Sequence, residues 1–184
     1  MTLKKQLIMA AIDVIEQDGL PGFTMRRVAA VCGVSCAAPY KHFAGKEELF
    51  LAVLDYVQGE WRKEQDRIIA ENEGDLQKQL VEASLAYIRF LTDNPHFRAV
   101  VMLRGSAVPD ERQRRAEMSS HTRELVSKWC IKSGYTHEQT VRKTFTVRSI
   151  IFGAVMMFES GELEYTDENM AMIEKCIRRE FTLE

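Results

Sequence analysis

Two cysteines and a histidine lie close together near the N-terminus. Cys32 and Cys36 are four residues apart, and His42 follows six residues later. Thiolates and imidazoles bind zinc, but a closed structural zinc site needs four ligands. Gly33 also turns the chain between the two cysteines. We therefore expect no metal here, with Cys32 packed as a buried thiol and Cys36 as a small exposed side chain.

Histidines elsewhere in the chain lack the spacing that catalysis requires. His96, His121 and His137 could each pair with a carboxylate. They are not accompanied by a nucleophile elbow, a zinc-type histidine pair or a glycine-rich phosphate loop. The sequence therefore predicts neither an enzyme nor a bound cofactor.

Basic side chains gather at the N-terminal end. Residues 1–46 carry six basic and three acidic groups, whereas the whole chain of 184 residues has 25 basic and 27 acidic groups. A basic head on an acidic body is typical of a protein whose head alone meets a polyanion. Chance could also produce this asymmetry, so it does not define a site by itself.

The composition is that of a globular protein. Apolar residues make up 46% of the chain, which is too many for disorder. No apolar run approaches the roughly 20 residues that span a bilayer. Four cysteines in a chain of this size predict reduced thiols and a cytoplasmic location, not a disulfide framework. Cys130 and Cys176 are each isolated, and we expect them to pack in the core.

Apolar residues recur at helical spacing, and no stretch shows the alternation of a strand. Thr24 and Ser35 are expected to cap two short helices, with Gly33 as the turn between them and Gly45 before a longer helix. The sequence predicts an all-α fold of about nine helices. Their expected ranges are about 3–18, 24–32, 35–43, 46–72, 76–92, 96–105, 110–133, 137–160 and 167–181.

The first three helices form a helix-turn-helix pattern, in which the last helix would enter the major groove of DNA. The pattern includes Ala10-Ala11, Gly19, Phe23-Thr24, Val28-Ala29, Gly33-Val34-Ser35, Tyr40, His42-Phe43, Lys46-Glu47 and Leu49. These residues, at fixed spacing over about 45 positions, resemble the TetR family of transcriptional regulators.

The resemblance implies a homodimer that binds double-stranded operator DNA. Residues 1–47 would be the DNA-binding domain, and residues 48–184 a helical domain that binds a small molecule and dimerises through its last two helices. The implied function is a ligand-responsive repressor, released from a palindromic operator by an effector. The alternative is a DNA-binding protein whose body binds a protein partner instead of an effector.

The resemblance places ten residues at the DNA. Thr24 and Arg26 would meet phosphates, and Arg26 could also bind a guanine. Lys46 would add its charge to the amides at a helix N-terminus, where anions bind. The full set of expected DNA contacts is Thr24, Arg26, Ser35, Cys36, Ala37, Ala38, Tyr40, Lys41, His42 and Lys46.

Pro39 departs from the family pattern, which usually has another apolar residue before the tyrosine. If Ser35 caps the helix, Pro39 removes its first hydrogen bond and should push Ala38 out of α geometry. The reach of Cys36 and Ala37 toward the bases depends on this distortion.

Aromatic and methionine side chains in the body could line a ligand pocket, although side chains at helical spacing more often belong to the core or to a dimer interface. Arg148 could bind a ligand carboxylate, with a surface position as the alternative. The candidate ligand-binding residues are Trp61, Phe97, Met102, Trp129, Arg148 and Phe152. The candidate dimer residues are Ile151, Ala154, Phe158, Ile173 and Ile177.

Overall fold

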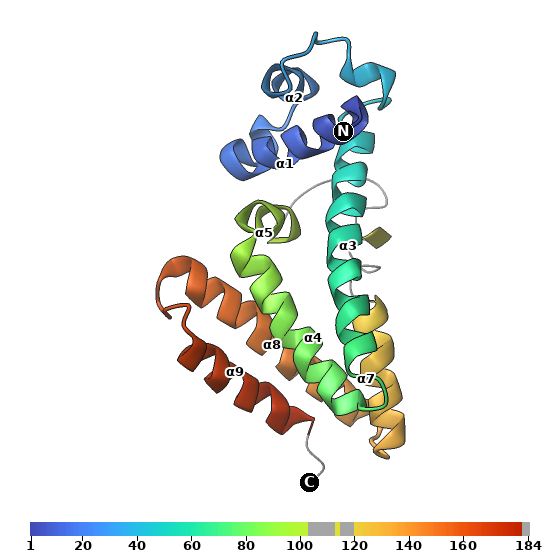
Figure 1. The fold of residues 1–184 in the computed structure, drawn as a ribbon, viewed down its shortest axis with the longest axis vertical. Coiled ribbons are helices and arrows are strands. Elements are labelled where there is room, and N and C mark those ends of the chain that lie inside the picture. The colour runs from blue at the N-terminus through green and yellow to red at the C-terminus, as the bar shows by residue number, and fades with distance from the viewer. Residues whose placement is uncertain (103–112, 115–119, 182–184) are drawn as a thin grey trace. The chain divides into compact units, whose positions relative to one another are not determined.

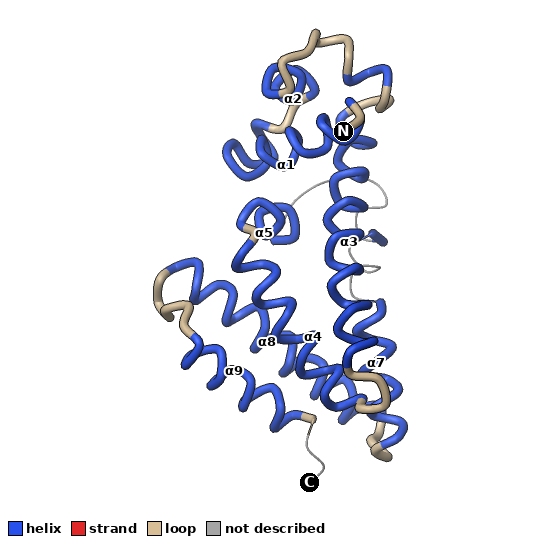
Figure 2. The backbone as a smooth tube through the Cα atoms, viewed as in Figure 1, coloured by secondary structure: helices blue, strands red, loops and turns tan. Residues whose placement is uncertain are grey.

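The computed structural model describes residues 1–102, 113–114 and 120–181. Within these ranges the regular structure is helical, and Figures 1 and 2 show no strand there. This confirms the predicted all-α fold. None of the described helices is long and apolar enough to cross a membrane. The elements are α1 (Leu3–Gly22), α2 (Met25–Val31), the 3₁₀ turn η1 (Pro39–Lys41), α3 (Lys46–Glu71), α4 (Leu76–Asp93), α5 (Pro95–Met102), α7 (Ser120–Lys132), α8 (His137–Ser160) and α9 (Asp167–Glu180).

Most helix boundaries lie within a residue or two of the predicted ones. The expected helices over 96–105 and 110–133 extend partly outside the described residues. The chain forms two compact units, one of Met1–Glu60 with Asn94–Met118 and one of Trp61–Asp93 with Ser119–Glu184. Helix α3 begins at Lys46 and continues past residue 47. The domain boundary expected at residue 47 separates two functions and stays a prediction.

In the first unit, α1 packs against α2 and α5. Gly19 interrupts α1 with φ 65°, at the turn predicted for residues 19–22. Phe23 follows this turn, is fully buried, and lies 6.0 Å from the Phe50 ring of α3. The ring of Tyr56 on α3 meets Phe97 of α5 edge to face at 6.2 Å. Apolar packing around the start of α3 therefore holds the first unit together.

In the second unit, α4 contacts α7, α8 and α9. Trp61 of α3 is buried and packs on Tyr87 and Phe90 of α4, with ring centroids 4.6 and 5.5 Å away. Ile68, further along α3, belongs to the same buried cluster. The second half of α3 therefore packs against α4 through Trp61 and Ile68.

Threonine caps and polar clamps fix the helix ends of the second unit. Thr136 forms a capping box with Gln139 at the start of α8, and Thr166 caps α9. At the end of α9, the buried Lys143 of α8 donates to the Glu180 carbonyl at 2.8 Å. The amide of Gln77 on α4 donates to the Phe181 carbonyl at 2.9 Å. Carbonyls that the helix leaves unpaired are thus satisfied by neighbouring helices.

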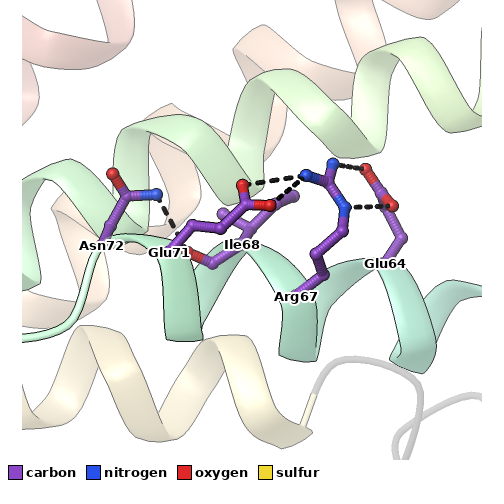
Figure 3. Close-up of polar contacts among 5 residues, drawn as sticks. All are labelled: Glu64, Arg67, Ile68, Glu71 and Asn72. Atoms are coloured by element: carbon purple, nitrogen blue, oxygen red, sulfur yellow. Dashed lines mark hydrogen bonds and ion pairs between the residues drawn. The ribbon is translucent and has the colours of Figure 1, made fainter.

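Charged side chains also stabilise the C-terminal part of α3 (Figure 3). Arg67 binds Glu64 with its Nη2 2.5 Å from Oε1, and Glu71 with its Nη1 2.6 Å from Oε1. The hydrogen bond from Arg67 lowers the pKa of Glu64. Asn72 donates to the Ile68 carbonyl at 2.9 Å and so caps the helix end. Each exposed pair adds little, but together they favour the helix.

Gln65 provides a test of the core of the second unit. Its side chain is 2% exposed, and its Nε2 donates to Thr122 Oγ1 on α7 at 2.7 Å. We predict that Thr122→Val lowers the free energy of unfolding by about 1–3 kcal/mol, because a buried donor loses its acceptor. Urea denaturation measures this change.

Thr122→Ser keeps the hydroxyl and serves as the control. The double variant Gln65→Leu/Thr122→Val should recover much of the loss, because it removes both polar partners. A double variant as unstable as Thr122→Val alone would contradict this account.

Candidate DNA-binding interface

The turn between α1 and α2 sets the position of the first candidate contacts. Thr24 Oγ1 accepts a hydrogen bond from the Arg27 amide at 3.1 Å, so Thr24 caps α2 as predicted. Val28 and Ala29 are buried beneath α2, whereas Arg26 is exposed. Arg26 therefore lies on the outer face of α2.

The candidate recognition segment is not the α-helix expected over 35–43. Its one regular element is the 3₁₀ turn Pro39–Lys41. The Ala38 amide donates to Ser35 O at 2.9 Å and the Lys41 amide to Ala38 O at 3.2 Å, so both bonds span three residues. Pro39 has no amide to donate to the Ser35 carbonyl, which explains why the segment does not begin with an α-helical turn. A bond across four residues occurs only later, from the Phe43 amide to Pro39 O at 3.0 Å.

The expected distortion of Ala38 is also corrected. Its φ and ψ are −62° and −44°, within the right-handed α region. The residue before a proline usually avoids this region. Here the bond from its own amide to Ser35 fixes the turn geometry. The prediction of a left-handed Gly33 at the exit from α2 is confirmed, with φ 68°.

The ten expected DNA contacts all retain accessible surface. Eight are exposed, and Ala38 and His42 are half-buried. Tyr40 stands out, since a side chain this apolar is 59% exposed. Pro39 is buried beside it. The 3₁₀ turn thus anchors itself through the proline ring and presents its neighbours to solvent.

The charged residues of this surface differ in how they are held. Arg26 and Lys41 have no ion pair or hydrogen bond from their side chains among the described residues. Lys46 Nζ lies 3.4 Å from Leu20 O and 5.6 Å from the centre of the Phe23 ring. Lys46 therefore fastens the start of α3 to the α1–α2 turn as well as carrying a positive charge.

The sequence did not single out the ion pair between Asp18 and Arg27. Arg27 Nε lies 2.8 Å from Asp18 Oδ2. The two residues are nine positions apart and face each other only because the chain turns at residues 19–22. Helical periodicity carries no signal for such a pair.

The cysteine side chains agree only in part with the expectations, since Cys32 is half-buried and not fully buried. Cys36 is exposed and Cys130 is buried, as expected, whereas Cys176 is exposed and not in the core. Burial, together with the Asp13 carboxylate, raises the pKa of Cys32 and so disfavours the thiolate that binds metal. The described residues contain no cluster that could hold a metal ion.

Three of the six candidate ligand-binding residues lie in one aromatic series. Tyr87 links Trp61, at 4.6 Å, to Phe152, at 6.5 Å, and the Arg148 guanidinium lies 6.0 Å from the Phe152 ring. Arg148 itself is exposed.

The other three candidates lie elsewhere. Trp129 packs against Tyr135 and Phe181. Phe97 is buried in the first unit, where the half-buried Met102 also belongs.

Most candidate dimer residues are buried within the single chain. Four of them are no more than 6% exposed, and Phe158 is half-buried against Tyr165. The apolar surface that α8 and α9 leave exposed comes from different residues. These are Val141, Phe145, Met156 and Met172.

Residues 7–53 match the family model described as bacterial regulatory proteins, tetR family. The nucleoid occlusion factor SlmA of Marinobacter nauticus is 24% identical over 88% of this chain and 82% of its own length. The transcriptional repressor DrrR1 of Streptomyces coeruleorubidus is 40% identical, over 29% of this chain and 20% of its own. A TetR family transcription regulator from Marinobacter aquaeolei has a similar structure, with a TM-score of 0.77 and 16% identity over 96% of this chain and 94% of that one.

These matches concern two different extents of the chain. Residues 7–53 are similar to the TetR-family segment, and the fold of the whole described chain is similar to that of a TetR family transcription regulator. The resemblance found in the sequence is thereby confirmed.

Pro39 provides a test of the recognition segment. We predict that Pro39→Ala, which restores an amide opposite Ser35 O, converts residues 36–41 from a 3₁₀ turn toward an α-helix. Backbone ¹³C chemical shifts report this change directly. The variant should also bind a duplex selected by the parent protein about fivefold more weakly or worse, because displaced side chains at one base pair cost that much.

Thermal unfolding of the variant shows whether a loss of DNA affinity comes from a less stable fold alone. Unchanged chemical shifts at residues 36–41 would mean that contacts other than the missing amide impose the 3₁₀ turn.

Proposed function

We propose that this protein is a homodimeric, sequence-specific DNA-binding repressor that a small molecule releases from a palindromic operator. The observation that carries the proposal is the helix-turn-helix segment with its accessible basic and short side chains. Arg26 and Lys41 are exposed and free to bind bases or phosphates. Cys36, Ala37 and Ala38 are short enough for close contact with thymine methyl groups.

The remaining contacts of the proposed interface orient the protein on the DNA. The hydroxyl groups of Thr24, Ser35 and Tyr40 can donate hydrogen bonds to phosphate oxygens. His42 would contribute at the edge of this surface. Lys46 adds a charge beside the first turn of α3. Such contacts fix the register of the protein without reading the sequence.

The exposed apolar residues of α8 support a dimer. Val141, Phe145 and Met156 recur near helical spacing, with the half-buried Phe152 between them. A face of this kind costs free energy in water unless a partner covers it. A second copy can do so in a two-fold arrangement in which each α8 and α9 meets its counterpart. Ile151 and the other buried residues of α8 would then pack in the core of the chain and hold this exposed face in place.

Phe145 tests the dimer. Its side chain is 71% exposed, so Phe145→Asp should leave the chain folded and abolish the dimer. Light scattering should then change from about twice the chain mass of 21.1 kDa to that mass. Glu138→Ala, near the start of the same helix, is the control and should stay dimeric.

A folded Phe145→Asp variant with unchanged mass would place the interface elsewhere. Ile151→Asp tests the opposite, buried face of α8. A charge at this position should lower the melting temperature of the protein, whereas Phe145→Asp should not.

Helix α3 provides a route for effector control. Lys46 at its first residue adjoins the DNA-binding surface, whereas Trp61 begins the aromatic series of the second unit. Both residues belong to the same helix, Lys46–Glu71. An effector that binds among the aromatic residues, with Arg148 for an acidic group, can act on the DNA-binding segment through this helix.

The alternative function is a DNA-bound protein whose body recruits a protein partner. The observation that favours it is the relative named a nucleoid occlusion factor, whose match extends over most of this chain. In that case no small molecule would alter DNA binding.

One titration separates the two functions. A small-molecule library is screened for compounds that displace a labelled duplex selected by the protein from a random-sequence pool. A hit is then titrated calorimetrically with and without this duplex. A repressor should bind the effector about 5- to 150-fold more weakly when DNA is present, because coupling between two sites is reciprocal. Equal affinities would contradict effector release and favour the protein-partner function.

A further inference from the structure

Asp18, at the end of the regular part of α1, holds the side chain of Arg27. Arg27 Nε lies 2.8 Å from Asp18 Oδ2. Asp18 is itself packed against the turn, since a Cβ added to Gly22 would lie 2.3 Å from the Asp18 Cβ. The turn between α1 and α2 therefore brings this carboxylate to Arg27 in a fixed position.

The ion pair occupies only part of the guanidinium. Nε donates to Asp18, and the terminal Nη1 and Nη2 groups donate no hydrogen bond to other described residues. The Arg27 side chain is 48% exposed. Its own amide is held by Thr24, a candidate phosphate contact. Arg27 thus combines a fixed stem with accessible terminal donors, and it lies directly beside two candidate DNA contacts, Arg26 in the sequence and Thr24 through its amide.

Arg26 shows what the ion pair changes. It is exposed on the same helix, yet no carboxylate orients its side chain among the described residues. A free arginine loses rotamer freedom when it binds a phosphate, whereas a side chain already held at Nε loses less. Asp18 would repel DNA by its charge, so its presence at this surface favours a role in orienting Arg27.

We propose that Asp18 is a positioning residue for DNA binding, which orients Arg27 so that its terminal amino groups bind a backbone phosphate. The inference rests on the proposed DNA-binding function and adds a contact that the family resemblance did not assign. The proposal predicts an unexpected change in DNA affinity when Asp18 is removed. Loss of a negative charge should weaken DNA binding instead of strengthening it.

The test measures affinity for the selected duplex by fluorescence anisotropy. Asp18→Ala is expected to weaken binding about threefold to tenfold, the cost of ordering one long side chain. Glu16→Ala removes a carboxylate from the same helix and is the matched control, with binding unchanged or slightly stronger. Asp18→Glu keeps an acceptor and should recover part of the affinity.

A double-variant cycle distinguishes positioning from a general effect on the fold. In an Arg27→Ala background, Asp18→Ala should no longer weaken binding. Arg27→Ala should also lower the magnitude of the salt slope by about 0.9 for each phosphate that the arginine no longer neutralises, or roughly two per dimer. Thermal unfolding shows which variants fold, and Asp18→Asn replaces Asp18→Ala if the latter does not.

Two results would overturn the proposal while leaving the proposed function intact. One is an Asp18→Ala protein that binds the duplex as tightly as the parent or more tightly. The other is an equal loss in both Arg27 backgrounds, which would mean that Asp18 acts through the fold. A parent protein that selects and binds no duplex would instead overturn the proposed function itself, and this proposal with it.

Discussion

A single stripe of buried side chains along α3 underlies both compact units. Leu49, Val53 and Val57 are fully buried in the first unit, and Trp61 and Ile68 continue the stripe in the second. Since the helix has no break over its 26 residues, the two cores share one backbone. Gln65 also lies in this stripe. Its burial is tolerated because Thr122 Oγ1 accepts a hydrogen bond from its side-chain amide. The start of α3 is joined to the DNA-binding segment through Lys46, so the geometry of that segment depends on the same helix.

The DNA-binding segment combines rigid backbone with unevenly restrained side chains. Pro39 is buried and enforces a 3₁₀ turn, which leaves short residues before it and Tyr40 and Lys41 after it at the surface. Arg27 and Lys46 are held by neighbouring groups, whereas Arg26 and Lys41 are not held by any among the described residues. Held side chains suit contacts with phosphates, whose positions vary little among sequences, and free side chains can adapt to base edges.

The second unit separates aromatic side chains into distinct groups. Trp61, Tyr87 and Phe152 follow one another from α3 through α4 to α8. Trp129 instead packs on Phe181, whose carbonyl is held by Gln77. Together with the bond from Lys143 to Glu180, these contacts fix the end of α9 against three other helices. The first group is therefore the better candidate for an effector site, because the second is committed to holding α9.

The sequence by itself determined most of the described helices and their ends, since these depend on neighbours within about four positions. Thr24 caps α2 and Gly33 leaves it in left-handed geometry, as predicted, and the TetR-type segment was recognisable from its spacing. The sequence showed that Pro39 departs from the family pattern. It did not show the consequence, which is a 3₁₀ turn with Ala38 still in α geometry. Only the tertiary structure decided that Asp18 meets Arg27, that Ile151 faces inward while Phe145 faces outward, and that Trp61 and Trp129 lie in different groups. Each of these depends on which helix faces are covered by segments remote in the chain, and periodicity identifies an apolar face without identifying what packs against it.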